Sequence, residues 1–520
     1  MKKVICMILS VIFCMGLFGC GDGPSQGKNE KTTMLKISYF DGGNGDVWLR
    51  TIADAFETVY PDVKVDTGSF LNYSNIESML SAGIYQCDLL CSITDNTTGG
   101  NKGYFISLND VMDNPVSEEE QFTVREKLGA ISDASDFTFN GVTNTYQMPS
   151  HLGATSLCYN KSSLDYLFPS GYELPVTTKG LIKMCNDIKN TEKGWGLVYT
   201  LDSDAEYAIY LRDILTAQYM GYENFKLYYE GSYKNANGEV KFASDVSDLN
   251  NYWHEARRSA LEVCSTLYNV RNGYVPTSVK QMDFSKAQAY FWGVTSQVDY
   301  MPTAFMVNGD WLYSEVEYLN ENKASDIRMM RVPINSEIIN VLDTVNSEEK
   351  LVECVKYVDS QIEGEAAERP AYLSEKDYQR LLEARKMIWT THCQQTFSIP
   401  YNSKCIDIAK EFLRFVASDE GCYLYSSSLQ GRYSPYSRSV VDTKKLNNFT
   451  KSLNHILDNM IAVTQQHTLI STIGGLSFFG AHYFSRNLSQ GVAPAEILSD
   501  FETGLVNNWE SMKKSCGIVD

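Results

Sequence analysis

Strand and helix patterns alternate along the chain between residues 35 and 93. Residues 35–40 alternate apolar and polar side chains, as a half-buried strand does, and the glycine-rich segment 41–46 follows as a turn. Apolar residues then recur at helical spacing as far as Phe56. The predicted elements are strands over 35–40, 63–65 and 87–93 and helices over 47–59 and 77–82. Such alternation is typical of an α/β domain, here with a mostly parallel sheet flanked by helices.

Size and charge limit the class of protein further. The chain has 520 residues, more than a single hydrophobic core usually holds, so we predict two or more lobes. Hydrophobic residues make up 43% and charged residues 21%, which is the balance of a globular body that folds in water. The net charge of -19 repels polyanions and argues against nucleic acid as a direct partner.

The first residues have the pattern of an export signal. Lys2 and Lys3 precede an uncharged apolar run, Val4–Phe18, which is too short to span a bilayer comfortably. Residues 17–20 (LFGC) resemble the lipobox of bacterial lipoproteins, in which the cysteine becomes the acylated N-terminus. We therefore predict a signal peptide over 1–19, lipidation of Cys20 and a flexible tether over 20–33. The alternative is an ordinary signal peptide with a chance cysteine.

The spacing of the cysteines does not match a metal-binding motif. Ten lie beyond the export segment, from Cys87 to Cys516, and none forms a C-x-x-C pair. Most stand inside apolar stretches, as Cys158 and Cys185 do, so we predict buried free thiols rather than disulfides, and no metal site.

Several separated motifs occur in an informative order. They are Ala55-Phe56-Glu57-x-x-Tyr60-Pro61-Asp62, Cys87-Asp88-Leu89-Leu90, Tyr146-Gln147-Met148-Pro149, Leu157-Cys158-Tyr159-Asn160-Lys161, Pro175-Val176-Thr177-Thr178, Asn308-Gly309-Asp310-Trp311 and Ile399-Pro400-Tyr401-Asn402-Ser403-Lys404. Together, over roughly residues 35 to 505, they resemble the family of extracellular solute-binding proteins that includes maltose-binding protein. The chain departs from that family in length, because residues 225–250 and 340–390 look like insertions.

The resemblance implies two α/β lobes that are joined by two or three crossings and close on a ligand like a hinge. The crossings are expected near Pro149 and Pro400. Lobe one would hold residues 34–150 and 395–438, and lobe two residues 151–394 and 439–520.

The resemblance also implies a function. It predicts a non-enzymatic receptor without a cofactor, anchored by lipid to the outer face of the cell membrane of a Gram-positive-type bacterium. The expected ligand is a carbohydrate, most simply an oligosaccharide. The expected partners are the transmembrane permease subunits of an ABC importer, and the chain is expected to be a monomer.

Polar candidates for ligand binding lie in two loops. Asp95 and Asn96 come directly after a predicted buried strand, at family positions that hydrogen-bond sugar hydroxyls. Asp41 and Asn44 stand in the first strand-to-helix loop, where glycines allow close backbone approach to a ligand. For each of these residues the alternative is a simple turn role.

Aromatic candidates are needed because sugar rings present apolar faces of C–H groups. Trp311 matches a family position where a tryptophan stacks on sugar, and Tyr207 and Tyr210 fall where the family places a cleft tyrosine. Phe478 and Phe479 lie near another cleft aromatic of the family. The alternative for each is a place in the core.

Two other classes of protein stay open at this point. A secreted glycosidase would use paired carboxylates, but the sequence has no G-x-S-x-G, H-E-x-x-H or G-x-x-x-x-G-K-[ST] motif. A surface sensor or adhesin could use the same binding fold. Peptides, polyols and other polar solutes also stay open as ligands.

Overall fold

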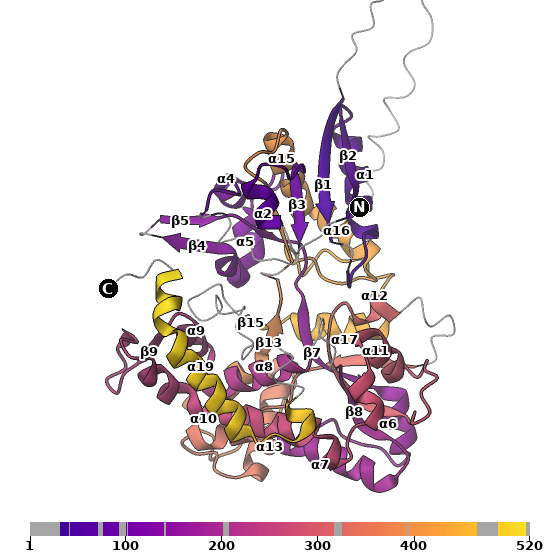
Figure 1. The fold of residues 1–520 in the computed structure, drawn as a ribbon. Helices are drawn as coiled ribbons and strands as arrows, with labels where there is room; N and C mark the ends of the chain where they lie inside the picture. The colour runs from indigo at the N-terminus through magenta and orange to yellow at the C-terminus, as the bar shows by residue number, and fades with distance from the viewer. Residues whose placement is uncertain are drawn as a thin grey trace, which may run out of the picture.

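Two lobes, one above the other, make up the folded body of the chain (Figure 1). The computed structural model describes residues 32–515 except 41, 71–75, 93–99, 101, 140–141, 201–206, 317–324, 393–394 and 465–486. Each lobe is built around its own sheet, so the α/β prediction is confirmed.

Lobe one contains a five-stranded sheet in the order β2-β1-β3-β14-β6. Strand β1 is parallel to β2 and β3, whereas β14 is antiparallel to β3 and β6. The strands are β1 (Thr33–Tyr39), β2 (Val63–Phe70), β3 (Leu89–Ser92), β6 (Met148–Pro149) and β14 (Thr396–Ser398). Its helices are α1 (Val47–Val59), α2 (Ile76–Ser81), α4 (Asn109–Asp113), α5 (Val124–Leu128), α15 (Ile406–Ala417) and α16 (Asp419–Ser428), with a hairpin of β4 (Asp136–Phe139) and β5 (Val142–Thr145).

The predicted opening β1-α1-β2 is confirmed, and local periodicity explains it. Helix α1 buries Trp48, Leu49, Ile52 and Phe56, which recur at three- and four-residue spacing and therefore share one face. It ends at Val59, and its C-cap Tyr60 comes directly before a proline that cannot continue a helix. The apolar face packs against the sheet and against α16.

Lobe two contains a six-stranded sheet in the order β15-β13-β7-β11-β8, with β12 beside β7. The strands are β7 (Ala154–Asn160), β8 (Trp195–Val198), β11 (Thr303–Gly309), β12 (Ile327–Met330), β13 (Met387–Thr390) and β15 (Ile461–Val463). Its helices are α6 (Lys161–Leu167), α7 (Thr178–Thr191), α8 (Ala208–Met220), α9 (Tyr222–Tyr229), α10 (Val246–Tyr268), α11 (Phe284–Trp292), α12 (Leu312–Val316), α13 (Glu348–Ile362), α14 (Glu375–Lys386), α17 (Asn448–Leu457) and α19 (Pro494–Ser515).

Both sheets are mixed, but in each of them only one strand runs against the others, β14 in lobe one and β7 in lobe two. In lobe two, β7 is antiparallel to all three of its partners, β11, β12 and β13. Parallel neighbours need a crossover connection, usually through a helix. Strand β7 instead enters directly from lobe one, so the crossing between the lobes fixes its direction.

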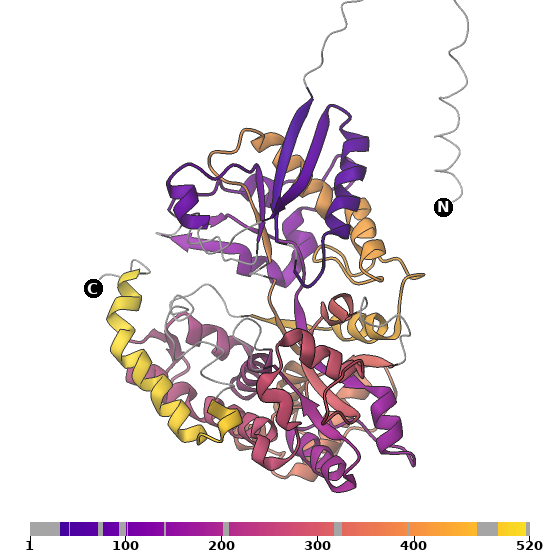
Figure 2. The ribbon, with the colours of Figure 1, turned by 45° about the vertical axis from the view of Figure 1, so that its right-hand side comes forward.

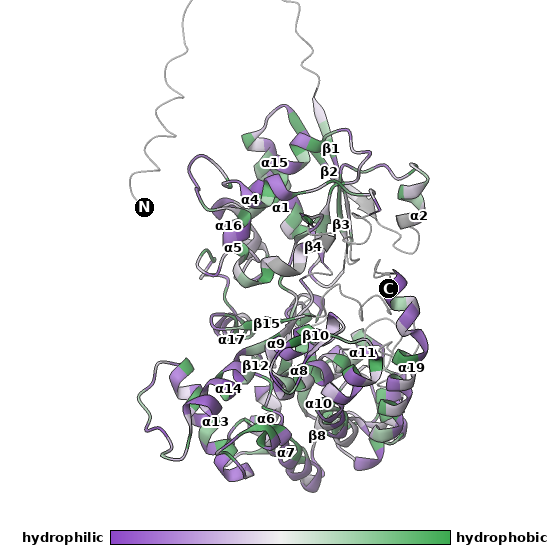
Figure 3. Cartoon of the chain, turned by 90° about the vertical axis from the view of Figure 1, so that its left-hand side faces the viewer, coloured by the Kyte–Doolittle hydropathy of each residue, from purple (hydrophilic) through white to green (hydrophobic). Residues whose placement is uncertain are grey.

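The two segments expected to be insertions have their own structure. Within 225–250, part of α9 leads into a hairpin of β9 (Ser232–Lys234) and β10 (Val240–Phe242). Within 340–390, α13 and α14 enclose a small core separate from the main one, which includes Leu351, Val355 and Leu381. Hydrophilic and hydrophobic residues both occur along α13 and α19, as in helices that bury one face (Figure 3). In the described part of the chain, no helix combines the length and the apolarity that a bilayer span requires.

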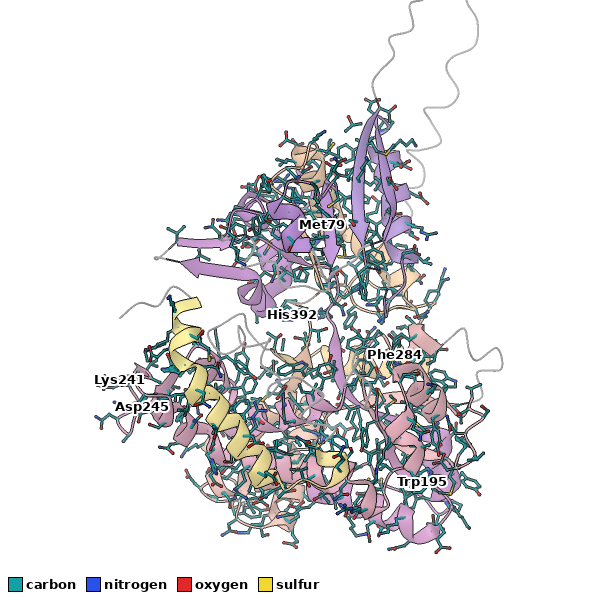
Figure 4. The ribbon with its side chains drawn as sticks, in the orientation of Figure 1. Met79, Trp195, Lys241, Asp245, Phe284 and His392 are labelled. Atoms are coloured by element: carbon teal, nitrogen blue, oxygen red, sulfur yellow. The ribbon has the colours of Figure 1, made fainter. Side chains whose placement is uncertain are left out.

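Three segments connect the lobes (Figure 2). The first joins β6 to β7 through residues 150–153, and the second joins β13 to β14. The third runs from α16 in lobe one to α17 in lobe two. His392, in the second crossing, lies between the two lobes (Figure 4). The return crossing was expected near Pro400. It lies between β13 and β14, a few residues earlier, and Pro400 itself pairs with Phe105 inside lobe one.

The first two crossings are bonded to each other. The backbone N–H of Ser150 donates to the Gln395 carbonyl at 2.7 Å, and that of Thr391 donates to the Gly153 carbonyl at 3.0 Å. Gly153 has φ +57, and a Cβ there would lie 2.0 Å from Thr391 Oγ1. Only glycine combines this backbone conformation with so close a neighbour.

We expect Gly153→Ala to lower the free energy of unfolding by about 2–4 kcal/mol, because it adds left-handed backbone strain to a steric clash. Gly364→Ala is the matched control, since Gly364 has φ +70 but nothing within 4 Å of a Cβ. Urea unfolding of both variants separates the two effects. Equal losses in the two variants would show that the contact with Thr391 contributes nothing.

Candidate ligand-binding site

Four aromatic rings from three segments gather in lobe two. Tyr207 and Tyr210 stand at the start of α8, Trp311 follows β11, and Trp389 lies in β13. The centroid of the Trp311 ring is 5.5 Å from that of Tyr207 and 6.5 Å from that of Tyr210. Tyr210 and Trp389 are stacked with their centroids 6.4 Å apart. We call these four residues the aromatic cluster, and it unites three of the residues predicted from the sequence.

The sheet explains why these rings meet. Strands β8 and β11 are parallel, and β11 and β13 are both antiparallel to β7, so β8, β11 and β13 run in the same direction. Their carboxyl ends therefore lie at one edge of the sheet. Tyr207 follows β8, Trp311 follows β11, and Trp389 is near the end of β13. Ligands of α/β sheets bind beyond this edge.

Trp311 lies between two glycines, one from each lobe. Its ring folds back over Gly309, where a Cβ would be 2.3 Å from the ring. On the other side is Gly43 of the loop after β1, where a Cβ would lie 3.2 Å from Trp311 Cβ. The lobes thus meet at Trp311, whose side chain is only 5% exposed.

Sequence reasoning missed Trp389. It falls within 340–390, a range set aside as an insertion, although its last residues form the central strand β13. The strand-like run Met387-Ile388-Trp389-Thr390, buried throughout, was the available signal.

Sequence reasoning also missed Arg432, which connects the lobes beside the aromatic cluster. Its Nη2 donates to Asn44 Oδ1 of lobe one at 2.7 Å. Its Nη1 donates to the Asp310 carbonyl of lobe two at 2.6 Å and lies 3.5 Å from the Asp310 carboxylate. Burial raises the pKa of Asp310, while the charge of Arg432 and backbone N–H groups oppose that rise.

Asn44 was predicted to bind ligand directly. The structure places it, buried, against Arg432, so its side-chain oxygen already has a strong partner. Its contact with a ligand stays a prediction. The predicted residues Cys20, Asp41, Asp95, Asn96, Phe478 and Phe479 lie outside the described residues.

The tyrosine hydroxyls at the cluster are uncharged, and a carboxyl group lies beside them. Burial, reinforced by the charge of Glu315, raises the pKa of both Tyr207 and Tyr210, so their hydroxyls stay protonated and can donate and accept hydrogen bonds. Burial also raises the pKa of Glu315 to about 7, against the effect of a hydrogen bond from Gln288. Flat rings with neutral hydroxyls can bind a ligand that has apolar faces and a polar edge.

The described residues include neither a cluster of metal-ligating side chains nor a disulfide. No group of three or more His, Cys, Asp or Glu side chains there could hold a metal ion. The eight described cysteines are all free thiols, and the seven other than Cys405 are buried, as predicted.

Solved structures share this architecture. No protein-family model matches the chain, and neither does any curated protein. The ABC substrate-binding protein Lmo0181 from Listeria monocytogenes, in complex with cycloalternan, is 12% identical with a TM-score of 0.55, over 94% of this chain and 100% of that one. RafE from Streptococcus pneumoniae, without ligand, is 14% identical with a TM-score of 0.56, over 94% of this chain and 99% of that one. A chitin oligosaccharide binding protein is 14% identical with a TM-score of 0.56, over 91% and 98%.

The chain has the two-lobed fold of the solute-binding proteins. This confirms the fold that the separated motifs predicted, and the similarity covers nearly the whole of each matched chain. In this two-lobed fold the aromatic cluster lies at the boundary between the lobes, because Trp311 touches both of them.

We expect Gly309→Ala to displace the Trp311 ring and to lower the free energy of unfolding by about 1–3 kcal/mol, as overpacking does. Gly309 does not have a positive φ, so the cost should come from the ring rather than from the backbone. The control is the same substitution in a Trp311→Ala background, where we expect almost no further loss. A loss of equal size in both backgrounds would contradict this arrangement.

Proposed function

We propose that this protein binds an oligosaccharide outside the cell and delivers it to the permease of an ABC importer. The observation that carries the proposal is the aromatic cluster, which lies at the carboxyl edge of the lobe-two sheet and touches lobe one through Gly43. Sugar rings have apolar faces that stack on such side chains and hydroxyls that pair with neutral tyrosines.

The similar structures support this ligand class. They include a protein in complex with cycloalternan, one in complex with raffinose, and a chitin oligosaccharide binding protein. At 12–14% identity they share the fold, and the ligand is our inference for this chain. We also propose the lobe boundaries 34–150 plus 395–438 and 151–394 plus 439–520, and a monomeric state.

The carboxylates near the cluster favour binding over hydrolysis. A glycosidase needs two carboxyl groups that flank the scissile bond. Asp213 is bonded to Arg212 and Arg257, and Asp310 to Arg432. Among the described residues near the cluster, Glu315 therefore has no second carboxylate free of an ion pair, as a glycosidase would need.

Calorimetric titration with raffinose, cycloalternan, and chitin and xylan oligosaccharides tests the proposal. We expect at least one to bind, and Trp311→Ala to weaken that binding about ten- to a hundredfold, because aromatic anchors carry much of the binding energy. Trp195→Ala is the control, since Trp195 is a half-buried ring of the same lobe that lies far from the lobe boundary (Figure 4). Both variants should lose stability, but only Trp311→Ala should lose affinity. Absence of binding across the panel would contradict the proposal.

We also propose that acylated Cys20 anchors the protein to the outer face of the membrane. The support is the charged start, the apolar run and LFGC at 17–20. In the producing bacterium, Cys20→Ala should release the protein from the membrane fraction or leave it as precursor, because acyl chains supply the anchoring energy. Mass spectrometry of the mature wild-type N-terminus gives the direct answer. Any N-terminus other than an acylated Cys20 ends this proposal.

A further inference from the structure

Glu315 occupies an unusual position beside the aromatic cluster. It lies one helical turn after Trp311, and its backbone N–H donates to the Trp311 carbonyl at 3.1 Å. Its Oε2 accepts a hydrogen bond from Nε2 of Gln288, a buried residue of α11. Its Oε1 faces the lobe-one loop, 3.7 Å from where a Cβ of Gly43 would be. Within the described residues, Oε1 has no hydrogen-bond partner.

Among the residues that the structure describes, no cation forms an ion pair with this carboxyl group. The groups that face it are the hydroxyls of Tyr207 and Tyr210, whose pKa values its charge helps to raise, and the neutral amide of Gln288. The nearby cations already have other partners. Arg432 pairs with Asp310, and Lys286 of α11 pairs with Asp283 at 2.6 Å.

A carboxyl group held in this way is costly for the folded protein. Withdrawal of a carboxylate from water is unfavourable unless hydrogen bonds or an opposite charge replace the lost hydration. Gln288 satisfies one oxygen only. The other oxygen is directed to the place where the two lobes meet at Trp311, so a donor on a bound molecule is the partner that this arrangement lacks.

We infer that Glu315 is a ligand-binding residue, whose Oε1 accepts hydrogen bonds from hydroxyl groups of the sugar unit that lies against Trp311. This rests on the proposed function and makes the ligand more specific. An acidic sugar would bring a second negative charge to Glu315 without a cation to separate them, and like-charge contact is an effective means of rejection. The site therefore selects neutral, hydroxyl-bearing sugar units over uronic acids.

The same geometry couples ligand binding to the ionisation of Glu315. Hydroxyl donors stabilise the ionised form of Glu315, so ligand must lower its pKa from the value of about 7 in the free protein. Binding near pH 7 then releases protons. Affinity is highest above the free-protein pKa and falls as the pH drops below it, by at most about tenfold per pH unit.

Calorimetry of the wild-type protein and Glu315→Gln tests this, with the tightest neutral oligosaccharide of the panel above. Glutamine keeps the shape and cannot ionise. We expect affinity at pH 8 to fall about tenfold in the variant, and much less at pH 6, because a charge-assisted hydrogen bond is replaced by a neutral one. Titration at pH 7 in phosphate and in Tris, whose ionisation enthalpies differ, should show proton release in the wild type and none in the variant.

Glu230→Gln is the matched control, because Glu230 ends α9 of the same lobe and burial also raises its pKa. It should leave both affinity and proton release unchanged. If Glu315→Gln binds the sugar with wild-type affinity and the same proton release, Glu315 has a structural role only and the inference is wrong. Tighter binding of an oligosaccharide in which a uronic acid replaces one neutral unit would also overturn it. Absence of any sugar binding by the wild type would instead overturn the proposed function itself.

Discussion

The buried ion pair of Arg432 and Asp310 holds together the parts of the molecule on which the site depends. Both side chains are almost fully buried, with exposures of 4% and 6%. Loss of one partner of such a pair typically costs about 3–5 kcal/mol, because the other charge is left buried alone. Asp310 also exchanges hydrogen bonds with Ala154, the first residue of β7, so the pair fixes the first crossing as well. Trp311 is the next residue, and its position therefore depends on this contact.

Arg432 extends the same constraint to lobe one. It comes from the third crossing and donates to Asn44 in the loop after β1, the loop that also brings Gly43 to Trp311. A guanidinium group suits this task because its planar set of five donors can serve several acceptors in fixed directions. The lobes therefore meet through two kinds of contact. One is the directional hydrogen bond from Arg432 to Asn44, and the other is the packing of Gly43 against Trp311.

The sequence predicted the structure well where short-range interactions along the chain determine it. The β1-α1-β2 opening follows from apolar spacing between Leu35 and Val65, and Trp311 was found through its motif. The reversed direction of β7 was not predictable in this way, because β7 takes its direction from a crossing and not from a helix of its own. Arg432 was missed for a related reason. Its partners Asn44 and Asp310 are 388 and 122 residues away along the chain, and no local pattern records contacts at such separations.

Trp389 connects the two segments that were expected to be insertions with the candidate site. It closes the segment 340–390, whose helices α13 and α14 have a separate core and lead directly into β13. The other long segment begins in α9, where Phe225 packs edge-on against the same ring, with centroids 6.2 Å apart. Trp389 in turn stacks on Tyr210. The two segments that were expected to be insertions therefore meet at Trp389, and a change of packing in either one is transmitted to the other rings through it, because close-packed interiors transmit strain.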